Sequence, residues 1–228
     1  MKKQLSSFAV MFFVSACVLI VGNSSASAQM TVGGRVGLDI GSLSFSPDLP
    51  SGETSSSHTG FLVGGQLDDW FSDMWALSVQ LLYNQKGASL NYNESFDGIS
   101  VSGSGSEVLS YLEIPILAKV AFGSGDVKPY LFAGPSIGIL LSATGSSTAN
   151  GTSTSTSDDS DFNTLDLSAL VGAGVSYKLA GGPSLFVDAG YAIGLINIAK
   201  NNSSSTSTSM TNKTNDIRIA AGVMFPLD

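Results

Sequence analysis

Apolar residues recur at every second position in eight separate segments of the chain. In the first segment, Val36, Leu38 and Ile40 alternate with Gly37 and Asp39. This two-residue period is typical of a β-strand that has one apolar and one polar face. The eight segments that we predict as strands cover residues 32–41, 60–68, 77–86, 111–122, 130–139, 165–176, 185–195 and 217–225.

The connections between these strands alternate strictly in length. The three short ones are residues 69–74, 123–127 and 179–183, and the four long ones are residues 46–58, 87–107, 142–161 and 200–215. The long connections are rich in Ser, Thr, Gly and Asn, so we expect them to be loops without a packed core. An even number of strands with short turns on one side and long loops on the other is typical of outer-membrane barrels. The pattern predicts an all-β fold, an eight-stranded antiparallel up-and-down transmembrane β-barrel with short periplasmic turns, long outer loops and both termini in the periplasm.

Aromatic residues are expected to form two girdles, one at each membrane interface. Those beside the short turns or the carboxyl end are Trp70, Phe71, Trp75, Phe122, Tyr130, Tyr177 and Phe225. Those toward the long connections are Phe61, Tyr83 and Tyr191.

The first 28 residues have the pattern of a secretory signal peptide. Lys2 and Lys3 form a positive start, residues 8–21 are apolar, and Ala26-Ser27-Ala28 is a small-residue cleavage site. We predict a signal peptide over residues 1–28 and one outer-membrane β-barrel domain over residues 29–228. The alternative, lipidation of Cys17, is weaker because Cys17 lies inside the apolar segment and not at its end.

Composition excludes several classes of partner. Only 12% of the 228 residues are charged, about half the usual content of a soluble domain. After removal of residues 1–28, 8 basic and 18 acidic residues remain and the net charge becomes −10. This charge argues against a nucleic acid and against strong adhesion to anionic lipid headgroups. We expect outer-membrane lipid around the barrel, and protein partners at the outer loops or the periplasmic turns.

The polar face of the strands is better suited to a crowded lumen than to a wet surface. A soluble eight-stranded binding barrel, the main structural alternative, would need its charges on the outside. Here the polar face carries mostly Gly, Ser and Gln. Its charged residues are Arg35, Asp39, Lys86, Glu113, Lys119, Asp166, Asp188 and Arg218.

These four bases and four acids predict a paired charge network inside the lumen. We expect Asp39 to pair with Arg218 across the closing strands, and Lys86 to pair with Glu113 across the third and fourth strands. The alternative is that each charge is solvated separately in a wet lumen.

Several segments also resemble a known family. LLYNQKGASL, YLEIPILAKVAF, KPYLFAGPSIG, LFVDAGYAIGLINI and AAGVMFPL are similar to segments of the PorT-like outer-membrane β-barrel family, common in the Bacteroidota. The resemblance covers nearly the whole mature chain in the family's order, and its most distinctive part is Tyr111–Pro115 together with Lys128–Pro135. It implies a small integral barrel of the outer envelope, some members being linked to protein secretion or gliding, and it supplies no catalytic residue.

Candidates for catalysis or metal binding are few. His58, the only histidine, lies in the first long connection near Asp48 and Glu53, and its spacing does not support a catalytic set. Residues 159–163 resemble the start of a calcium loop, but Thr164 stands where a Gly is required. We predict that the protein is not an enzyme and has no metal or cofactor.

Two classes of function remain. The first is a structural, surface-interaction or secretion-associated barrel, and the second is a small channel. Eight strands leave an interior that side chains fill, whereas diffusion pores use about 16 to 18. The first class is therefore the prediction, the channel is the alternative, and an outer-membrane lipid-modifying enzyme is a weaker third.

Overall fold

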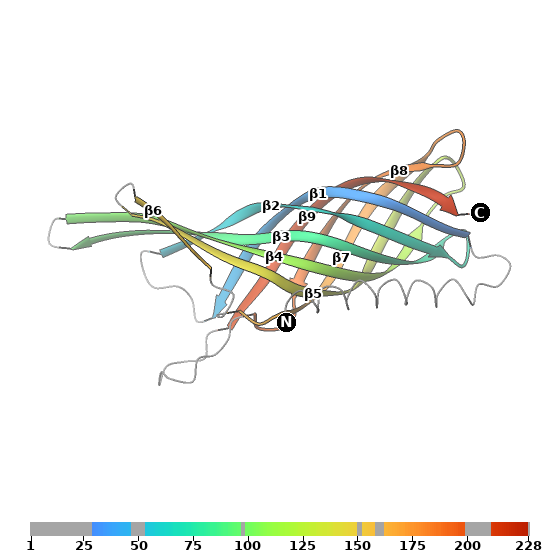
Figure 1. The fold of residues 1–228 in the computed structure, drawn as a ribbon. Helices are drawn as coiled ribbons and strands as arrows, with labels where there is room; N and C mark the ends of the chain where they lie inside the picture. The colour runs from blue at the N-terminus through green and yellow to red at the C-terminus, as the bar shows by residue number, and fades with distance from the viewer. Residues whose placement is uncertain are drawn as a thin grey trace.

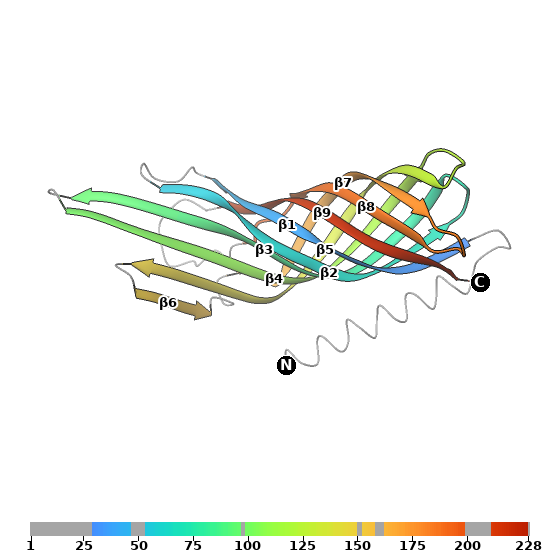
Figure 2. The ribbon, with the colours of Figure 1, turned by 90° about the horizontal axis from the view of Figure 1, so that it is seen from above.

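Eight antiparallel strands close into a barrel. The computed structural model describes residues 29–46, 53–96, 99–149, 152–157, 162–198 and 211–227. Neighbouring strands follow the order β4-β3-β2-β1-β9-β8-β7-β5, and β5 pairs with β4 to close the ring (Figures 1 and 2). The barrel strands are β1 (Gln29–Ser46), β2 (Glu53–Trp70), β3 (Trp75–Phe96), β4 (Ile99–Ala121), β5 (Val127–Ala149), β7 (Leu165–Lys178), β8 (Ser184–Gly194) and β9 (Thr211–Leu227).

The predicted eight-stranded barrel is confirmed. The predicted signal peptide, residues 1–28, lies outside the described residues. The described part of the chain contains no helix that is long and apolar enough to cross a membrane.

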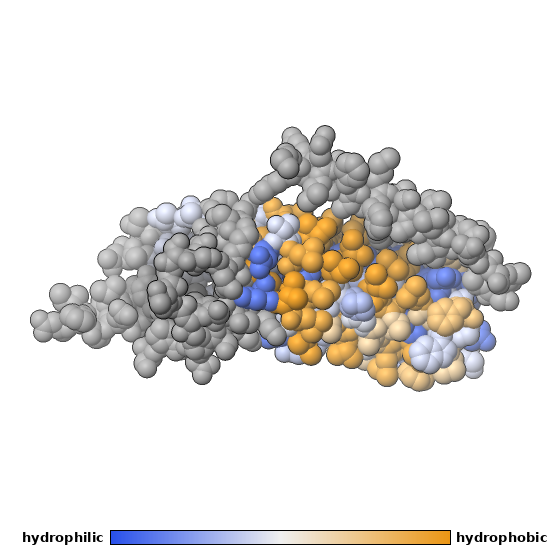
Figure 3. All heavy atoms as spheres, turned by 90° about the horizontal axis from the view of Figure 1, so that it is seen from below, coloured by the Kyte–Doolittle hydropathy of each residue, from blue (hydrophilic) through white to orange (hydrophobic). Residues whose placement is uncertain are grey.

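Side chains alternate between an apolar exterior and a filled interior. In β1, which pairs with β2 and β9, the side chains of Val36 and Leu38 are 63% and 51% exposed. Asp39, the next residue of the same strand, is 0% exposed. The alternation arises because successive side chains of a strand point to opposite faces of the sheet. Figure 3 shows the resulting apolar belt on one face of the barrel. Such a belt is the surface that meets the hydrocarbon region of a bilayer.

The aromatic girdle at the short turns contains fewer residues than predicted. Phe71, Trp75 and Phe122 are exposed there, as expected. Tyr130 is only 2% exposed, and its prediction as a girdle residue is wrong. It alternates with the exposed Leu131 and therefore points into the interior.

Three strands continue far beyond the length that a membrane requires. A tilted transmembrane strand needs about 9–11 residues, but β3 has 22 residues and β4 and β5 have 23 each. The predicted loop over residues 87–107 is therefore wrong, because β3 and β4 form one long hairpin in which Phe96 pairs with Ile99. Figure 1 shows this hairpin projecting from one end of the barrel.

The other long connections are also partly strand. Most of the predicted loop over residues 142–161 belongs to the end of β5 and to β6 (Thr152–Ser157), which pairs with β5 alone among the described strands. β2 already begins at Glu53 and β9 at Thr211, inside the other two predicted loops. We call residues 53–57, 88–96, 99–107, 142–149 and 152–157 the extended sheet.

Candidate functional site

Ten charged residues of the described ranges lie inside the barrel. All eight residues that the sequence assigns to the lumen are 7% exposed or less, and so are Asp68 and Asp216. The described interior therefore contains four bases and six acids, and the expectation of equal numbers is wrong. The ten residues form two clusters at different heights.

The hairpin-side cluster lies where the barrel passes into the extended sheet. It consists of Asp39, Lys86, Glu113, Asp166, Asp216 and Arg218. The Lys86 ammonium lies 2.7 Å from a carboxylate oxygen of Glu113, 3.0 Å from Asp216 and 3.2 Å from Asp166. One base on β3 thus connects β4, β7 and β9.

Arg218 is the second base of this cluster. Its guanidinium nitrogens lie 2.8 Å from Glu113 and 3.2 Å from both Asp39 and Asp216. Asn84 donates a 2.7 Å hydrogen bond to Asp39. Glu113 and Asp216 therefore contact both bases, and the six charges form one continuous network across the lumen.

The turn-side cluster lies near the short connections and consists of Arg35, Asp68, Lys119 and Asp188. Arg35 donates a 2.7 Å hydrogen bond to Asp188 and a 2.9 Å hydrogen bond to the side-chain carbonyl of Gln66. The Tyr130 hydroxyl donates to the other oxygen of Asp188 at 3.0 Å. Arg35 on β1 and Asp188 on β8 belong to strands that are not adjacent, so this contact braces the barrel across its interior.

The same chain of contacts continues to Lys119. Gln66 donates to Asp68 at 2.9 Å, and Lys119 donates to Asp68 at 3.0 Å. The Lys119 ammonium also lies 4.1 Å from the centre of the Tyr130 ring and 5.6 Å from that of Trp70. Stacking over an aromatic face stabilises a cation by the ring's negative electrostatic potential. The turn-side cluster is thus a ring of contacts that begins and ends at Tyr130.

Apolar side chains separate the two clusters and cover one of them. The layer between them consists of the buried residues Leu62, Leu82, Phe132 and Leu170. Above the hairpin-side cluster, the buried residues Leu109, Tyr111, Ala143, Phe162 and Ile198 form a second group, the apolar cap. Two interior cavities beside Arg35 have volumes of about 10 Å³ each, which is room for about one water molecule.

The structure brings together both pairs that the sequence suggests. Asp39 contacts Arg218, which lies directly opposite it in the β1–β9 register. Lys86 contacts Glu113 although Leu109 is its direct partner in the register, so that pair is diagonal.

Two acids of the network were not among the predicted lumen charges. Asp216 lies one residue before the predicted eighth strand, and continuing its alternation by one position identifies it as inward-facing. Asp68 lies at the end of the predicted second strand, and its two-residue spacing from Gln66 is the signal for the same orientation.

His58 occupies a strand and not a loop. It lies in β2 opposite Gly41 of β1, and its ring packs against Gly87 of β3. Asp48 and the calcium-like residues 159–161 lie outside the described residues. Within the described ranges, no group of three or more His, Cys, Asp or Glu side chains is arranged to hold a metal ion.

Comparison with known proteins agrees with this architecture. The model of a family described as outer membrane protein beta-barrel domain matches residues 23–200. No curated protein sequence matches the chain.

Among solved structures, the outer membrane protein OprG from Pseudomonas aeruginosa has a TM-score of 0.52 and 9% identity, covering 88% of this chain and 96% of OprG. This likeness is one of fold alone. Neisserial surface protein A has a TM-score of 0.41 and 17% identity, covering 87% of this chain and 98% of that chain. Ail of Yersinia pestis, solved with the heparin analogue sucrose octasulfate, has a TM-score of 0.39 and 16% identity, covering 86% of this chain and 99% of that chain.

Proposed function

Because this chain belongs to the outer membrane protein beta-barrel domain family and is an integral barrel of the outer membrane, we propose that it is a closed anchor that presents the extended sheet to partners at the cell surface. The filled interior is the observation that carries this proposal. Two charge clusters, an apolar layer between them and the apolar cap occupy the lumen. Cavities of about 10 Å³ beside Arg35 admit a water molecule but no larger solute.

Planar-bilayer recording tests the closed state against the channel alternative. The purified full-length barrel is expected to give no large steady conductance, since side chains that are cross-linked by ion pairs fill the lumen. A stable large conductance would favour a channel. A shift in apparent mass between unboiled and boiled gel samples serves as the control that the barrel is folded.

The proposed orientation places both termini and the short turns in the periplasm and the extended sheet outside. The contrast between strands that exceed the membrane span and turns of a few residues supports it. An epitope tag inserted at Gly151, between β5 and β6, should be labelled on intact cells, and a tag at Gly181, between β7 and β8, should not. Labelling at Gly181 alone would invert the orientation.

Within this function, a secretion-associated role is supported by the PorT-like resemblance of the strand segments. Its test is a pull-down from detergent-solubilised envelopes, in which components of a secretion assembly should be recovered with the barrel.

A non-enzymatic role is also part of the proposal. His58 packs beside Gly87 on the barrel wall, and the bases Lys86 and Arg218 are held by carboxylates. Replacing His58 by Asn is expected to leave the lipid profile of the outer membrane unchanged.

A further inference from the structure

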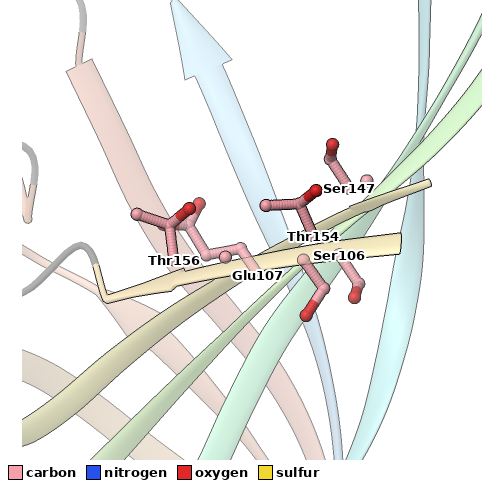
Figure 4. Close-up of a pocket in the computed structure, with 8 residues that line it drawn as sticks. Ser106, Glu107, Ser147, Thr154 and Thr156 are labelled. Carbon is pink, nitrogen blue, oxygen red and sulfur yellow. The ribbon is translucent and has the colours of Figure 1, made fainter. Parts of the chain in front are cut away.

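A polar groove lies on one face of the extended sheet. Its volume is about 270 Å³, and β4, β5 and β6 contribute its lining (Figure 4). Ligand pockets commonly have volumes of about 300–1,000 Å³, so the groove is suited to one or two units of a longer molecule that crosses the sheet.

The register of the strands explains why the groove is hollow. Gly105 of β4 lies opposite Ser147 of β5, which lies opposite Thr154 of β6. Residues directly opposite in an antiparallel sheet share a face. Gly105 therefore leaves the β4 end of this row without a side chain, and a Cβ placed there would meet only a backbone oxygen at 3.7 Å.

The next row has its glycine on the middle strand and a carboxylate at the β4 end. Glu107 of β4 lies opposite Gly145 of β5, which lies opposite Thr156 of β6. Figure 4 shows Glu107 and Thr156 beside each other, with Thr154 and Ser147 further along the groove. The two glycines form the floor, and the hydroxyl-bearing residues Ser147, Thr154 and Thr156 share this face with the Glu107 carboxylate.

We propose that this groove binds an uncharged glycan. Each Ser or Thr hydroxyl both donates and accepts hydrogen bonds, and the Glu107 carboxylate accepts them. This set complements a ligand that carries many hydroxyl groups. The glycine floor allows a sugar ring to approach the backbone closely.

The charge of the groove determines which glycans fit. Glu107 is the one charged residue among those that line it, and the mature chain as predicted is strongly acidic. Sulfated or carboxylated sugars would be repelled by these charges. The inference deepens the proposed surface-interaction function and rests on the extended sheet being outside the cell.

The test measures glycan binding by the full-length barrel in lipid nanodiscs. The probes are immobilised neutral oligosaccharides of glucose, mannose and N-acetylglucosamine, with sulfated oligosaccharides of similar length beside them. We expect binding to at least one neutral series and none to the sulfated series. Binding to sulfated probes alone, or to none of the probes, would overturn the proposal.

Variants of the groove connect the binding to this site. Gly105→Leu fills the floor and Glu107→Gln removes the charged acceptor, and each should weaken binding by about tenfold or more. Ser155→Ala is the matched control, because Ser155 alternates with Thr154 and Thr156, and its hydroxyl lies 3.3 Å from that of Ser146 on the other face. Unchanged binding by Gly105→Leu would exclude the groove.

Two further readouts keep the outcomes distinct. The boiled and unboiled gel samples show whether each variant is folded, and Thr154→Val replaces Gly105→Leu if the latter does not fold. Surface labelling of the tag at Gly151 is measured in parallel. Absence of glycan binding with intact labelling would reject the glycan alone, whereas absence of labelling would reject the proposed function.

Discussion

The two charge clusters of the lumen use the same residue types but connect them differently. In the hairpin-side cluster, Lys86 and Arg218 each contact three carboxylates. In the turn-side cluster, Arg35 and Lys119 each contact one. A shared network transmits the loss of one base to several acids, whereas one-to-one pairs confine the loss to a single partner.

The clusters also differ in how each balances its charge. The hairpin-side cluster has four acids for two bases, and the turn-side cluster has two acids for two bases. Aromatic rings lie beside bases of both clusters, since Arg35 is 5.5 Å from the centre of Phe186, Lys119 is 4.1 Å from that of Tyr130, and Lys86 is 5.3 Å from that of Tyr111. The comparison predicts that the cost of removing a charge depends on the cluster to which the charge belongs.

The largest effect is expected for Arg218→Ala. This change leaves Glu113 and Asp216 with Lys86 as their one contacting base and leaves Asp39 with none, and breaking a buried charge pair costs about 3–5 kcal/mol. Urea unfolding in lipid vesicles measures the free energy of unfolding, with the exposed Lys178→Ala as the control.

A double-mutant cycle sharpens this prediction. Asp39→Ala should also destabilise, but the double variant with Arg218→Ala should lose clearly less than the sum of the two single losses, because the residues contact each other. Additive losses would show that Asp39 and Arg218 do not interact energetically.

A smaller loss is expected for Lys119→Ala, about 1–3 kcal/mol. Asp68 keeps both hydrogen bonds from Gln66, at 2.9 and 3.1 Å, after the ammonium is removed. The same urea titration provides the measurement. A loss equal to that of Arg218→Ala would contradict the difference between the clusters.

Asp166→Asn is expected to change stability by less than about 1 kcal/mol. Asp166 contacts one base, Lys86, at 3.2 Å, and its removal relieves the excess of acids in that cluster. The amide keeps the size of the side chain and a partner in Thr214, whose hydroxyl lies 3.3 Å away. Glu113→Gln is the comparison variant and should cost more, because Glu113 contacts both bases. The reverse order would reject the inferred role of the charge excess.

The smallest effect is expected for Ser155→Ala in the extended sheet. A substitution away from the packed interior usually changes stability by less than about 0.5 kcal/mol. An unfolding midpoint that falls as far as for Lys119→Ala would show that the extended sheet stabilises the barrel.

The membrane-spanning half of each strand could be predicted from the sequence because lipid outside and charge inside impose a strong two-residue period. Val36, which is exposed, and Asp39, which is buried, show this contrast within the single strand β1. Beyond the membrane both faces of the sheet meet water, so the alternation between apolar and polar residues disappears. For this reason the sequence pattern predicts loops where β3, β4 and β5 continue as strands.

A different signal marks these continuations. Phe96 pairs with Ile99 and Ala149 with Thr152, so only two residues connect each pair of strands. The connecting residues are Asp97-Gly98 and Asn150-Gly151, which are the dipeptides favoured in two-residue hairpin loops. These turn dipeptides, and not a two-residue period, are the part of the sequence that indicates hairpins in these two segments.

For the lumen, alternation identifies which side chains point inward but not which of them meet. Arg218 on β9 reaches Glu113 on β4, and Arg35 on β1 reaches Asp188 on β8. Such contacts depend on the length of the side chains and on the diameter of the closed barrel. The alternation pattern of each single strand gives no information on that diameter.

The pairing of β1 with β9 has a consequence for biogenesis. This ladder runs without a shift from Met30 opposite Leu227 to Ser46 opposite Thr211, so it joins the first and the last described strands of the chain. Contacts between residues so distant along the chain close a very long loop and form slowly. The seam therefore cannot form until the last strand has emerged, and until then β1 carries an unpaired edge, which is a site where chains can aggregate.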